Sequence, residues 1–197
     1  MTGKLFVISG PSGVGKGTVV NKIMKNNNLF LSVSATTRSK REGEVEGINY
    51  YFKTHNEFED MIKNNEFLEW ARFCENSYGT PVKPVKDKLD DGIDVILEIE
   101  IQGAMQVKKN MPECVMIFIA PPSFDELEKR LKGRGTETKE VIDLRIATAK
   151  EEVKVAKNYD YIVVNDNIEE AVSDVLSIIK AEKCKKERVI EQMEVLK

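Results

Sequence analysis

One run of the sequence could bind phosphate directly: Gly10-Pro11-Ser12-Gly13-Val14-Gly15-Lys16-Gly17-Thr18, which follows the apolar segment Leu5–Ile8. Glycines let the backbone N–H groups of a tight turn point inward around an anion, and a following helix adds partial positive charge at its N-terminus. We expect a helix over Lys16–Met24, and Lys16 would bring a mobile cation to the outer phosphates. A glycine-rich run alone also fits a simple turn, but the strand, lysine and helix together favour a nucleotide phosphate loop.

The residue after the lysine departs from the commonest form of this loop. That position usually holds Ser or Thr, whose hydroxyl helps to hold magnesium, whereas this chain has Gly17 followed by Thr18. The Gly-Thr ending occurs among kinases of nucleoside monophosphates, so it favours a small-substrate kinase over a molecular switch. It also leaves magnesium to phosphates, water and an acidic side chain elsewhere.

A second cluster of charged residues lies in the run Ser34–Glu44, which contains Arg38 and Arg41. These arginines come at the exit of a predicted strand, a usual location for binding sites in α/β proteins. Two guanidinium groups could hold a phosphate in bidentate fashion. The same run could also be a solvated basic turn, and from these residues alone both interpretations stay open.

Length and composition predict one soluble globular domain. The chain has 197 residues, of which 41% are apolar and 32% charged. Its net charge of −3 argues against broad nucleic-acid binding, which needs a basic surface. An anionic substrate would therefore have to be met by locally clustered arginines.

The cysteine and histidine content gives no metal-binding pattern. Cys74, Cys114 and Cys184 are far apart and odd in number, which is typical of reduced thiols in a cytosolic protein. The single histidine follows Thr54, which has capping-box spacing to Glu57, so we interpret it as structural or solvated. No apolar stretch approaches membrane-spanning length and no signal-peptide pattern is present, so we expect a cytoplasmic protein without membrane contact.

Short apolar segments alternate with amphipathic ones, which predicts an α/β fold with a parallel sheet covered on both faces. The expected strands are Leu5–Ser9, Leu29–Ser34, Ile93–Ile99, Val115–Ala120 and Tyr161–Val164. The expected helices are Lys16–Lys25, Pro81–Asp90, Gln102–Asn110, Phe124–Leu131, Glu140–Lys157 and Ile168 to beyond Ile179. Ser123 and Glu126 form a second capping-box pattern.

Two insertions interrupt this alternation. Strand-like pieces at Tyr50–Phe52 and Phe67–Trp70 flank a helix near Glu57–Lys63, which predicts a small mixed subdomain. The segment Gly133–Glu137, rich in glycine and charge, joins two helices and is a candidate lid.

The C-terminal stretch Glu182–Lys197 is highly charged. Val189, Met193 and Leu196 recur at helical spacing, so a trailing helix is one interpretation. A solvated tail is the other, and it is favoured because charge-rich chain ends are commonly exposed.

The chain resembles the guanylate kinase family over about Lys4–Ile179. The resemblance rests on segments in the family's order: Gly10–Thr18, Ser34–Gly43, Gly47–Phe52, Phe67–Ala71, Tyr78–Thr80, Ile101–Gly103, Ile119–Ser123, Arg130–Thr136 and Val163–Asp166. It implies a three-layer P-loop core with a parallel sheet (3–33 and 82–181), a mixed α/β GMP-binding insertion (about 34–81) and a lid (about 133–140). The domain would span 3–181, with 182–197 as a charged extension.

The resemblance also implies a reaction. The enzyme would transfer the γ-phosphoryl group of ATP to GMP, and to dGMP, giving ADP and GDP in purine nucleotide metabolism, with Mg²⁺ bound to ATP. We expect a monomer or small homo-oligomer and no nucleic-acid partner. Two alternatives stay open: a non-catalytic binding module of the scaffold type, which typically has a degraded phosphate loop, and another small-molecule kinase on the same core.

The resemblance assigns individual roles. For ATP it implies Gly10, Pro11, Ser12, Gly13, Val14, Gly15, Lys16, Gly17, Thr18, Arg130, Arg134 and Asn165. For the GMP phosphate it implies Arg38, Arg41, Tyr50 and Tyr78, and for the guanine base Ser34, Glu69, Thr80 and Glu100. Lys16, Arg38, Arg134 and Arg145 would be catalytic. A carboxylate suits guanine because it accepts hydrogen bonds from N1–H and the exocyclic amine, whereas adenine lacks matching donors.

Two acids depart from the family's pattern. Glu98 and Glu100 stand where the family usually has aspartates, so the charge is kept but the reach is one methylene longer. We expect Glu98 to contribute to the magnesium site through water and Glu100 to face the guanine pocket, and the reverse order stays open.

Overall fold

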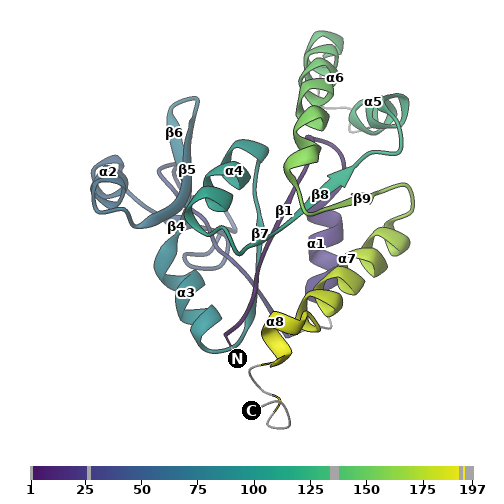
Figure 1. Cartoon of the computed structure of the whole chain (residues 1–197). Helices are drawn as coiled ribbons and strands as arrows, with labels where there is room; N and C mark the ends of the chain where they lie inside the picture. Colours follow the sequence, from purple (N-terminus) through teal and green to yellow (C-terminus); the bar gives the residue numbers. More distant parts are fainter. Residues whose placement is uncertain (1, 26–27, 134–137, 191–192, 194–197) are drawn as a thin grey trace. The chain divides into compact units, whose positions relative to one another are not determined.

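The computed structural model describes residues 2–25, 28–133, 138–190 and 193. The chain divides into two compact units. We call residues 8–27 and 115–197 the loop unit, and residues 2–7 and 28–114 the cavity unit. Strand β1 (Leu5–Ser9) begins in the cavity unit and ends in the loop unit (Figure 1).

The loop unit carries the strand order β1-β8-β9, with β8 at Val115–Ala120 and β9 at Tyr161–Val164. Strands β8 and β9 pair in parallel, and β8 is buried along nearly its whole length, as expected of a parallel strand covered on both faces. The helical elements are α1 (Lys16–Met24), α5 (Phe124–Lys132), α6 (Lys139–Lys154), the 3₁₀ turn η1 (Val155–Asn158), α7 (Ile168–Lys183) and α8 (Lys186–Val189).

Helices α5 and α6 share a small apolar core. Leu127 and Leu131 of α5 cluster there with Ile142 and Ala149 of α6. The pair in α5 is spaced by four residues and the pair in α6 by seven, which places each pair on one helix face. The packing holds α5 and α6 against each other. Arg145 of α6 contacts Ser12 of the loop between β1 and α1, and Arg130 of α5 contacts the backbone of Asn165.

The cavity unit contains two sheets. In the first, β2 (Leu29–Leu31) pairs in parallel with β7 (Asp94–Glu98), and β1 follows in the order β2-β7-β1. The second is mixed, in the order β4-β3-β6-β5, with β3 at Ala35–Thr36, β4 at Tyr51–Phe52, β5 at Phe67–Phe73 and β6 at Asn76–Pro81. Its helices are α2 (His55–Lys63), α3 (Val82–Asp90) and α4 (Ile101–Asn110).

Helix α2 covers the mixed sheet through Phe58, which stacks on Phe67 with ring centroids 4.4 Å apart. The helix begins at Thr54, whose hydroxyl accepts the Glu57 N–H at 3.2 Å while the Glu57 carboxylate accepts the Thr54 N–H at 2.7 Å. This reciprocal pair confirms the predicted capping box, and it satisfies two backbone donors at the helix start.

The expected α/β class and the mixed insertion are confirmed, but several element bounds differ. Strand β2 ends at Leu31 rather than Ser34, and the predicted helix 140–157 ends at Lys154 before the 3₁₀ turn. Strands β3 and β6 were not expected, because short polar segments become strands only through sheet pairing.

Three predictions are only partly open to inspection. Of the predicted lid, residues 134–137 lie outside the described residues, and so does Leu196. The short helix α8 occupies part of the C-terminal stretch, and Glu182, where the predicted extension begins, is fully buried in α7. The domain boundaries remain predictions.

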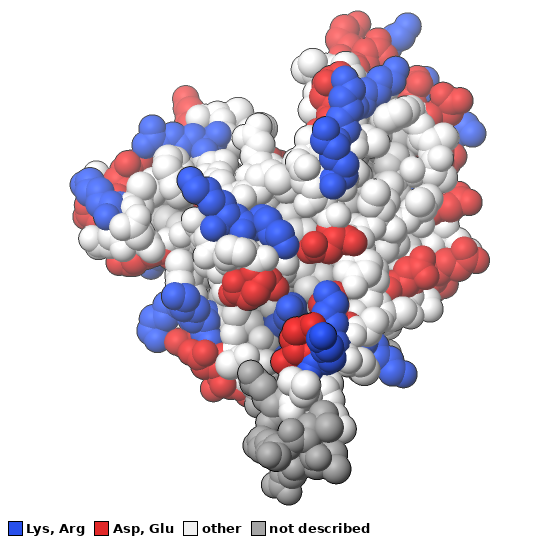
Figure 2. Space-filling model, in the orientation of Figure 1, with Lys and Arg blue, Asp and Glu red and all other residues white. Residues whose placement is uncertain are grey.

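Figure 2 shows basic and acidic side chains both distributed over the face in view. This mixture agrees with the small net charge of −3. Within the described part of the chain, no helix has the length and apolar character to cross a membrane. The same residues contain no group of three or more His, Cys, Asp or Glu arranged to hold a metal ion.

We expect Thr54→Ala to lower the free energy of unfolding by about 1 kcal/mol, because it removes the hydroxyl that caps α2. The melting temperature of a chain this long should fall by about 2–4 °C. Urea unfolding followed by circular dichroism would measure the change. The control is His55→Ala at the adjacent exposed position, which should leave stability within about 0.5 kcal/mol. Equal stability of the two variants would contradict the capping role.

Candidate active site

The loop between β1 and α1 is shaped by glycines in the left-handed region. Gly13 and Gly15 have φ of 87° and 95°, values that side chains with a Cβ rarely adopt. Gly10 has a second constraint, because a Cβ there would lie 2.2 Å from the carbonyl oxygen of Ile119 in β8. The loop therefore lies directly against β8, and it leads into the N-terminus of α1, where backbone N–H groups favour an anion.

Lys16 is the first residue of α1, and its ammonium group folds back over the loop. Its Nζ donates to the carbonyl oxygen of Gly10 at 2.6 Å and to that of Pro11 at 3.0 Å. The side chain is only partly buried. A cation held at the mouth of the loop can exchange these neutral acceptors for phosphate oxygens, which bind it more strongly.

Arg145 of α6 also reaches the loop. Its guanidinium NH1 donates to the hydroxyl of Ser12 at 3.4 Å, so a second cation lies beside the glycine-rich turn. The resemblance implied a catalytic role for Arg145, and the structure places its guanidinium group beside the loop. Arg134, the other predicted catalytic arginine of this part of the chain, lies outside the described residues.

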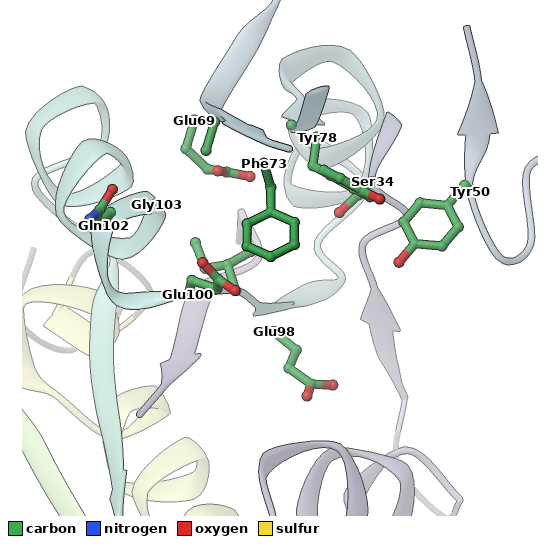
Figure 3. Close-up of a pocket in the computed structure, with 12 residues that line it drawn as sticks. Ser34, Tyr50, Glu69, Phe73, Tyr78, Glu98, Glu100, Gln102 and Gly103 are labelled. Carbon is green, nitrogen blue, oxygen red and sulfur yellow. The ribbon is translucent and has the colours of Figure 1, made fainter. Parts of the chain in front are cut away.

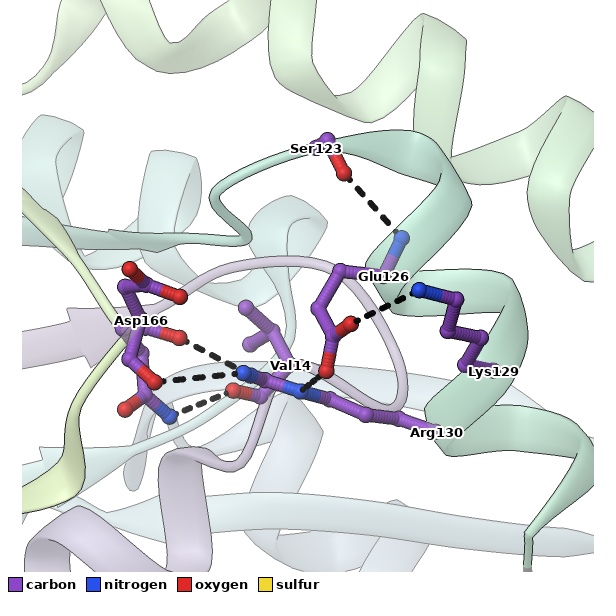
Figure 4. Close-up of polar contacts among 7 residues, drawn as sticks. Val14, Ser123, Glu126, Lys129, Arg130 and Asp166 are labelled. Atoms are coloured by element: carbon purple, nitrogen blue, oxygen red, sulfur yellow. Dashed lines mark hydrogen bonds and ion pairs between the residues drawn. The ribbon is translucent and has the colours of Figure 1, made fainter.

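Arg130 of α5 binds the backbone that follows β9 (Figure 4), and Asn165 of that segment binds the loop at Val14. The Arg130 guanidinium donates to the carbonyl oxygen of Asn165 at 2.9 Å and to Glu126 at 3.2 Å. The Asn165 amide is buried and donates to the carbonyl oxygen of Val14 at 2.8 Å. A Cβ on Gly15 would lie 2.6 Å from that amide nitrogen, so this glycine also makes room for Asn165.

The cavity unit encloses a pocket of about 300 Å³ (Figure 3). Six residues that the sequence predicted for the site line it: Ser34, Tyr50, Glu69, Tyr78, Glu98 and Glu100. The carboxylates of Glu69 and Glu100 and the ring of Phe73 lie around the same space. The pocket thus combines acceptors, hydroxyl groups and an aromatic surface, a set that suits a planar heterocycle with N–H donors.

Glu69 is the most constrained acid of this pocket. It lies on β5, 8% exposed, and its Oε1 accepts the hydroxyl proton of Thr80 on β6 at 2.6 Å. Burial raises the pKa of Glu69, the Thr80 hydrogen bond opposes that shift, and the nearby charge of Glu100 adds to it. A ligand that donates to this carboxylate would stabilise its charged form.

The guanidinium group of Arg38 is bound by Glu44, an acid to which the sequence analysis gave no role. Its NH2 donates to Glu44 at 2.6 Å, and its guanidinium lies 5.4 Å from the ring centroid of Tyr50. The other oxygen of Glu44 accepts the backbone N–H of Arg41 at 2.8 Å. The Arg38 hydrogen bond holds the pKa of Glu44 below its usual value, and Glu44 raises the pKa of Arg38. The sequence offered one signal for this role of Glu44, which lies three residues after Arg41 in the run Ser34–Glu44.

The structure therefore brings most of the predicted residues of the cavity unit together. Thr80 joins the pocket through Glu69, and Arg38 joins it through Tyr50. The side chain of Arg41 is exposed on the same loop as Arg38 and does not line the pocket. Pocket residues that the sequence reasoning did not identify are Ala71, Phe73, Gly79, Ile99, Gln102 and Gly103.

Comparisons with known proteins give one consistent family. The family model described as guanylate kinase matches residues 2–182. A guanylate kinase of Halalkalibacterium halodurans is 53% identical over 96% of this chain and 94% of its own length, and one of Clostridium tetani is 54% identical over 95% and 90%. The crystal structure of guanylate kinase from Anaplasma phagocytophilum has a TM-score of 0.76 at 35% identity, covering 100% of this chain and 97% of that one.

Replacing Glu69 with an uncharged residue should show how much the burial of its carboxylate lowers the free energy of unfolding. With a raised pKa, the stability linked to protonated Glu69 is complete below the unfolded value of about 4.3 and is lost as pH rises through the folded value. Glu69→Gln does not titrate and keeps an acceptor for Thr80. We expect this variant to be more stable than wild type at neutral pH, by about 2–4 °C if the gain is on the order of 1 kcal/mol.

Urea unfolding of both proteins from pH 3.5 to 8 would measure this difference. The gap should close in acid, where wild-type Glu69 is protonated as well. A gap that stays constant across this range, or that widens in acid, would contradict a raised pKa at Glu69.

Proposed function

The chain belongs to the guanylate kinase family, and on this premise we propose that it transfers the γ-phosphoryl group of ATP to GMP, giving ADP and GDP. The observation that carries the proposal is the pairing of Glu69 with Thr80 inside a pocket of guanine-compatible size and polarity. We infer that dGMP is also accepted, because the donors and acceptors of the base and the phosphate are unchanged.

The base would be read by the carboxylate. Glu69 can accept hydrogen bonds from N1–H and the exocyclic amine of guanine, while hydroxyl groups of Ser34 and Thr80 serve the remaining polar edge. Glu100 lines the same pocket and would add an acceptor. Adenine offers no N1–H, so it would leave a buried carboxylate unpaired, and sites built on such hydrogen bonds discriminate strongly.

The phosphate of GMP would be held by Arg38, Arg41, Tyr50 and Tyr78. In the structure Arg38 is bound to Glu44, so the incoming dianion would compete with that carboxylate for the guanidinium. The charge-assisted bonds of a phosphate to Arg38 and the phenolic donors favour the exchange.

ATP would be held by the loop residues Gly10–Thr18, with Asn165 directed at adenine and Arg130 supporting it. The hydrogen bond from Asn165 to Val14 supports a base site next to the phosphate site. A GMP phosphate oxygen is an adequate nucleophile, so the reaction needs no protein base, only in-line alignment and neutralisation of charge. Lys16, Arg38, Arg134 and Arg145 would supply that charge.

A hydrated Mg²⁺ ion fits the residues present. Glu98 is exposed at the end of β7, so its carboxylate can meet a water molecule. The described residues offer no cluster of three or more protein ligands, which suits an ion that keeps several waters and rests on nucleotide phosphates. When bound with ATP, Mg²⁺ would neutralise charge on the phosphates. Glu98 would act through water.

The remaining proposals concern the substrates, the cellular location and the oligomeric state. We propose ATP and GMP as the small-molecule substrates, a cytoplasmic location, and a monomer or small homo-oligomer. Neither a nucleic-acid nor a membrane partner is part of the proposal.

A coupled assay for ADP formation tests the proposed function. GMP and dGMP should stimulate ADP release from MgATP, whereas AMP and dTMP should give little. ADP formation independent of any nucleoside monophosphate, or preference for AMP or dTMP, would overturn the assignment. Nucleotide or peptide binding without turnover would indicate a binding module instead.

Lys16→Ala should lower kcat with GMP by at least about 100-fold, because it removes a cation at the transferring phosphate. Its melting temperature should remain near that of wild type, since Lys16 is only partly buried at the start of α1. The matched control is Lys22→Ala on the same helix, where the lysine pairs with Glu169 at the surface and should change kcat less than about twofold. Near-wild-type turnover by Lys16→Ala would contradict the role of this lysine.

A further inference from the structure

Strand β5 lies at the edge of the mixed sheet, and side chains of α4 bind its backbone. Gln106 accepts the Trp70 N–H at 3.2 Å and donates to the Trp70 carbonyl oxygen at 3.1 Å. Asn110 donates to the carbonyl oxygen of Leu68 at 2.8 Å. The two amides therefore hold the strand on both sides of Glu69, as a neighbouring strand would hold it.

Helix α4 also makes direct room for the Glu69 side chain. A Cβ built on Gly103 would lie 2.7 Å from Glu69 Oε2 and 3.2 Å from its Cδ. Gly103 lies inside a helix and needs no left-handed conformation, although glycine is less favourable there than alanine. The absence of a side chain at this position is therefore explained by the carboxylate that lies against it.

Gly103, Gln106 and Asn110 are spaced by three and four residues, so they share one face of α4. Along that face, Gly103 meets the carboxylate while Gln106 and Asn110 fix the backbone that carries it. On the opposite side, Thr80 holds Oε1 at 2.6 Å. The carboxylate is thus confined between a hydroxyl and a bare helix turn.

We propose that Gly103, Gln106 and Asn110 are positioning residues that set guanine specificity by fixing the Glu69 carboxylate. The proposal rests on the assignment of this chain as a GMP kinase and assigns these three residues a role in reading the base. Gly103 also lines the pocket, whereas Gln106 and Asn110 do not, and the role proposed for all three acts through Glu69.

Gly103→Ala is the direct test. The added methyl group should displace the end of the Glu69 side chain rather than the backbone, because that end is the flexible partner in the contact. We expect kcat/KM for GMP to fall by about 10- to 100-fold, as misplacement by a fraction of an ångström can do. The KM for ATP and the melting temperature should not worsen, since alanine favours the helix.

A double-mutant cycle separates positioning from general damage. Glu69→Asp withdraws the carboxylate from the methyl group of Ala, so adding Gly103→Ala to Glu69→Asp should lower kcat/KM for GMP by less than about threefold. If Gly103 were only structural, the second substitution would have the same effect in both backgrounds. Additive effects would therefore overturn the proposal.

Gln106→Ala tests the backbone clamp. It should raise the KM for GMP by about three- to tenfold with kcat for saturating GMP largely retained, because ground-state and transition-state contacts to the base weaken together. The matched control is Lys109→Ala, an exposed position on the same helix, which should leave both constants within about twofold. An unchanged KM for GMP in Gln106→Ala would contradict the clamp.

The outcomes separate the two levels of inference. A wild-type protein that does not phosphorylate GMP would refute the proposed function. A wild-type protein that does so, together with a Gly103→Ala variant of unchanged GMP kinetics, would refute only the positioning role.

Discussion

The burial of the Glu69 carboxylate is the constraint on which the cavity unit depends. An acid removed from water is destabilised as an anion, and the Thr80 hydroxyl offsets only part of that effect, because the pKa of Glu69 remains raised. In the proposed function, a base with two adjacent N–H donors would relieve this unfavourable arrangement. In the proposed role of Glu69, selectivity follows because guanine can donate to this carboxylate and adenine lacks the matching donors.

The loop unit differs from the cavity unit because its candidate site is built from backbone groups and cations instead of a buried carboxylate. Its glycines take left-handed backbone conformations, and Lys16 and Arg145 add positive charge beside the loop. Backbone groups and point charges bind phosphate without regard to the base attached to it. In the proposed function, the chain therefore binds phosphate with its backbone and cations, and reads a base with a buried side chain on a sheet.

Local chemistry made some of this predictable from the sequence. The phosphate loop was recognisable because its turn, lysine and helix are adjacent in the chain, and the Thr54 cap because its bonds span three residues. Strands β3 and β6 were not predictable, since their polar residues become strands only by pairing across the sheet. Glu69 could be assigned only by resemblance, because its partners are distant in sequence. For the same reason, neither Gly103 nor Gln106 could be connected with it.

The amide of Gln106 has a second consequence, for the fate of the protein at high concentration. An uncovered edge strand offers its backbone to any passing chain and can start the growth of aggregates. Here the N–H and carbonyl of Trp70 are already occupied by a side chain, so that stretch of β5 cannot recruit a strand from another molecule without first losing those bonds. A few polar residues on a helix thus protect the solubility of a sheet that would otherwise end in open hydrogen-bonding groups.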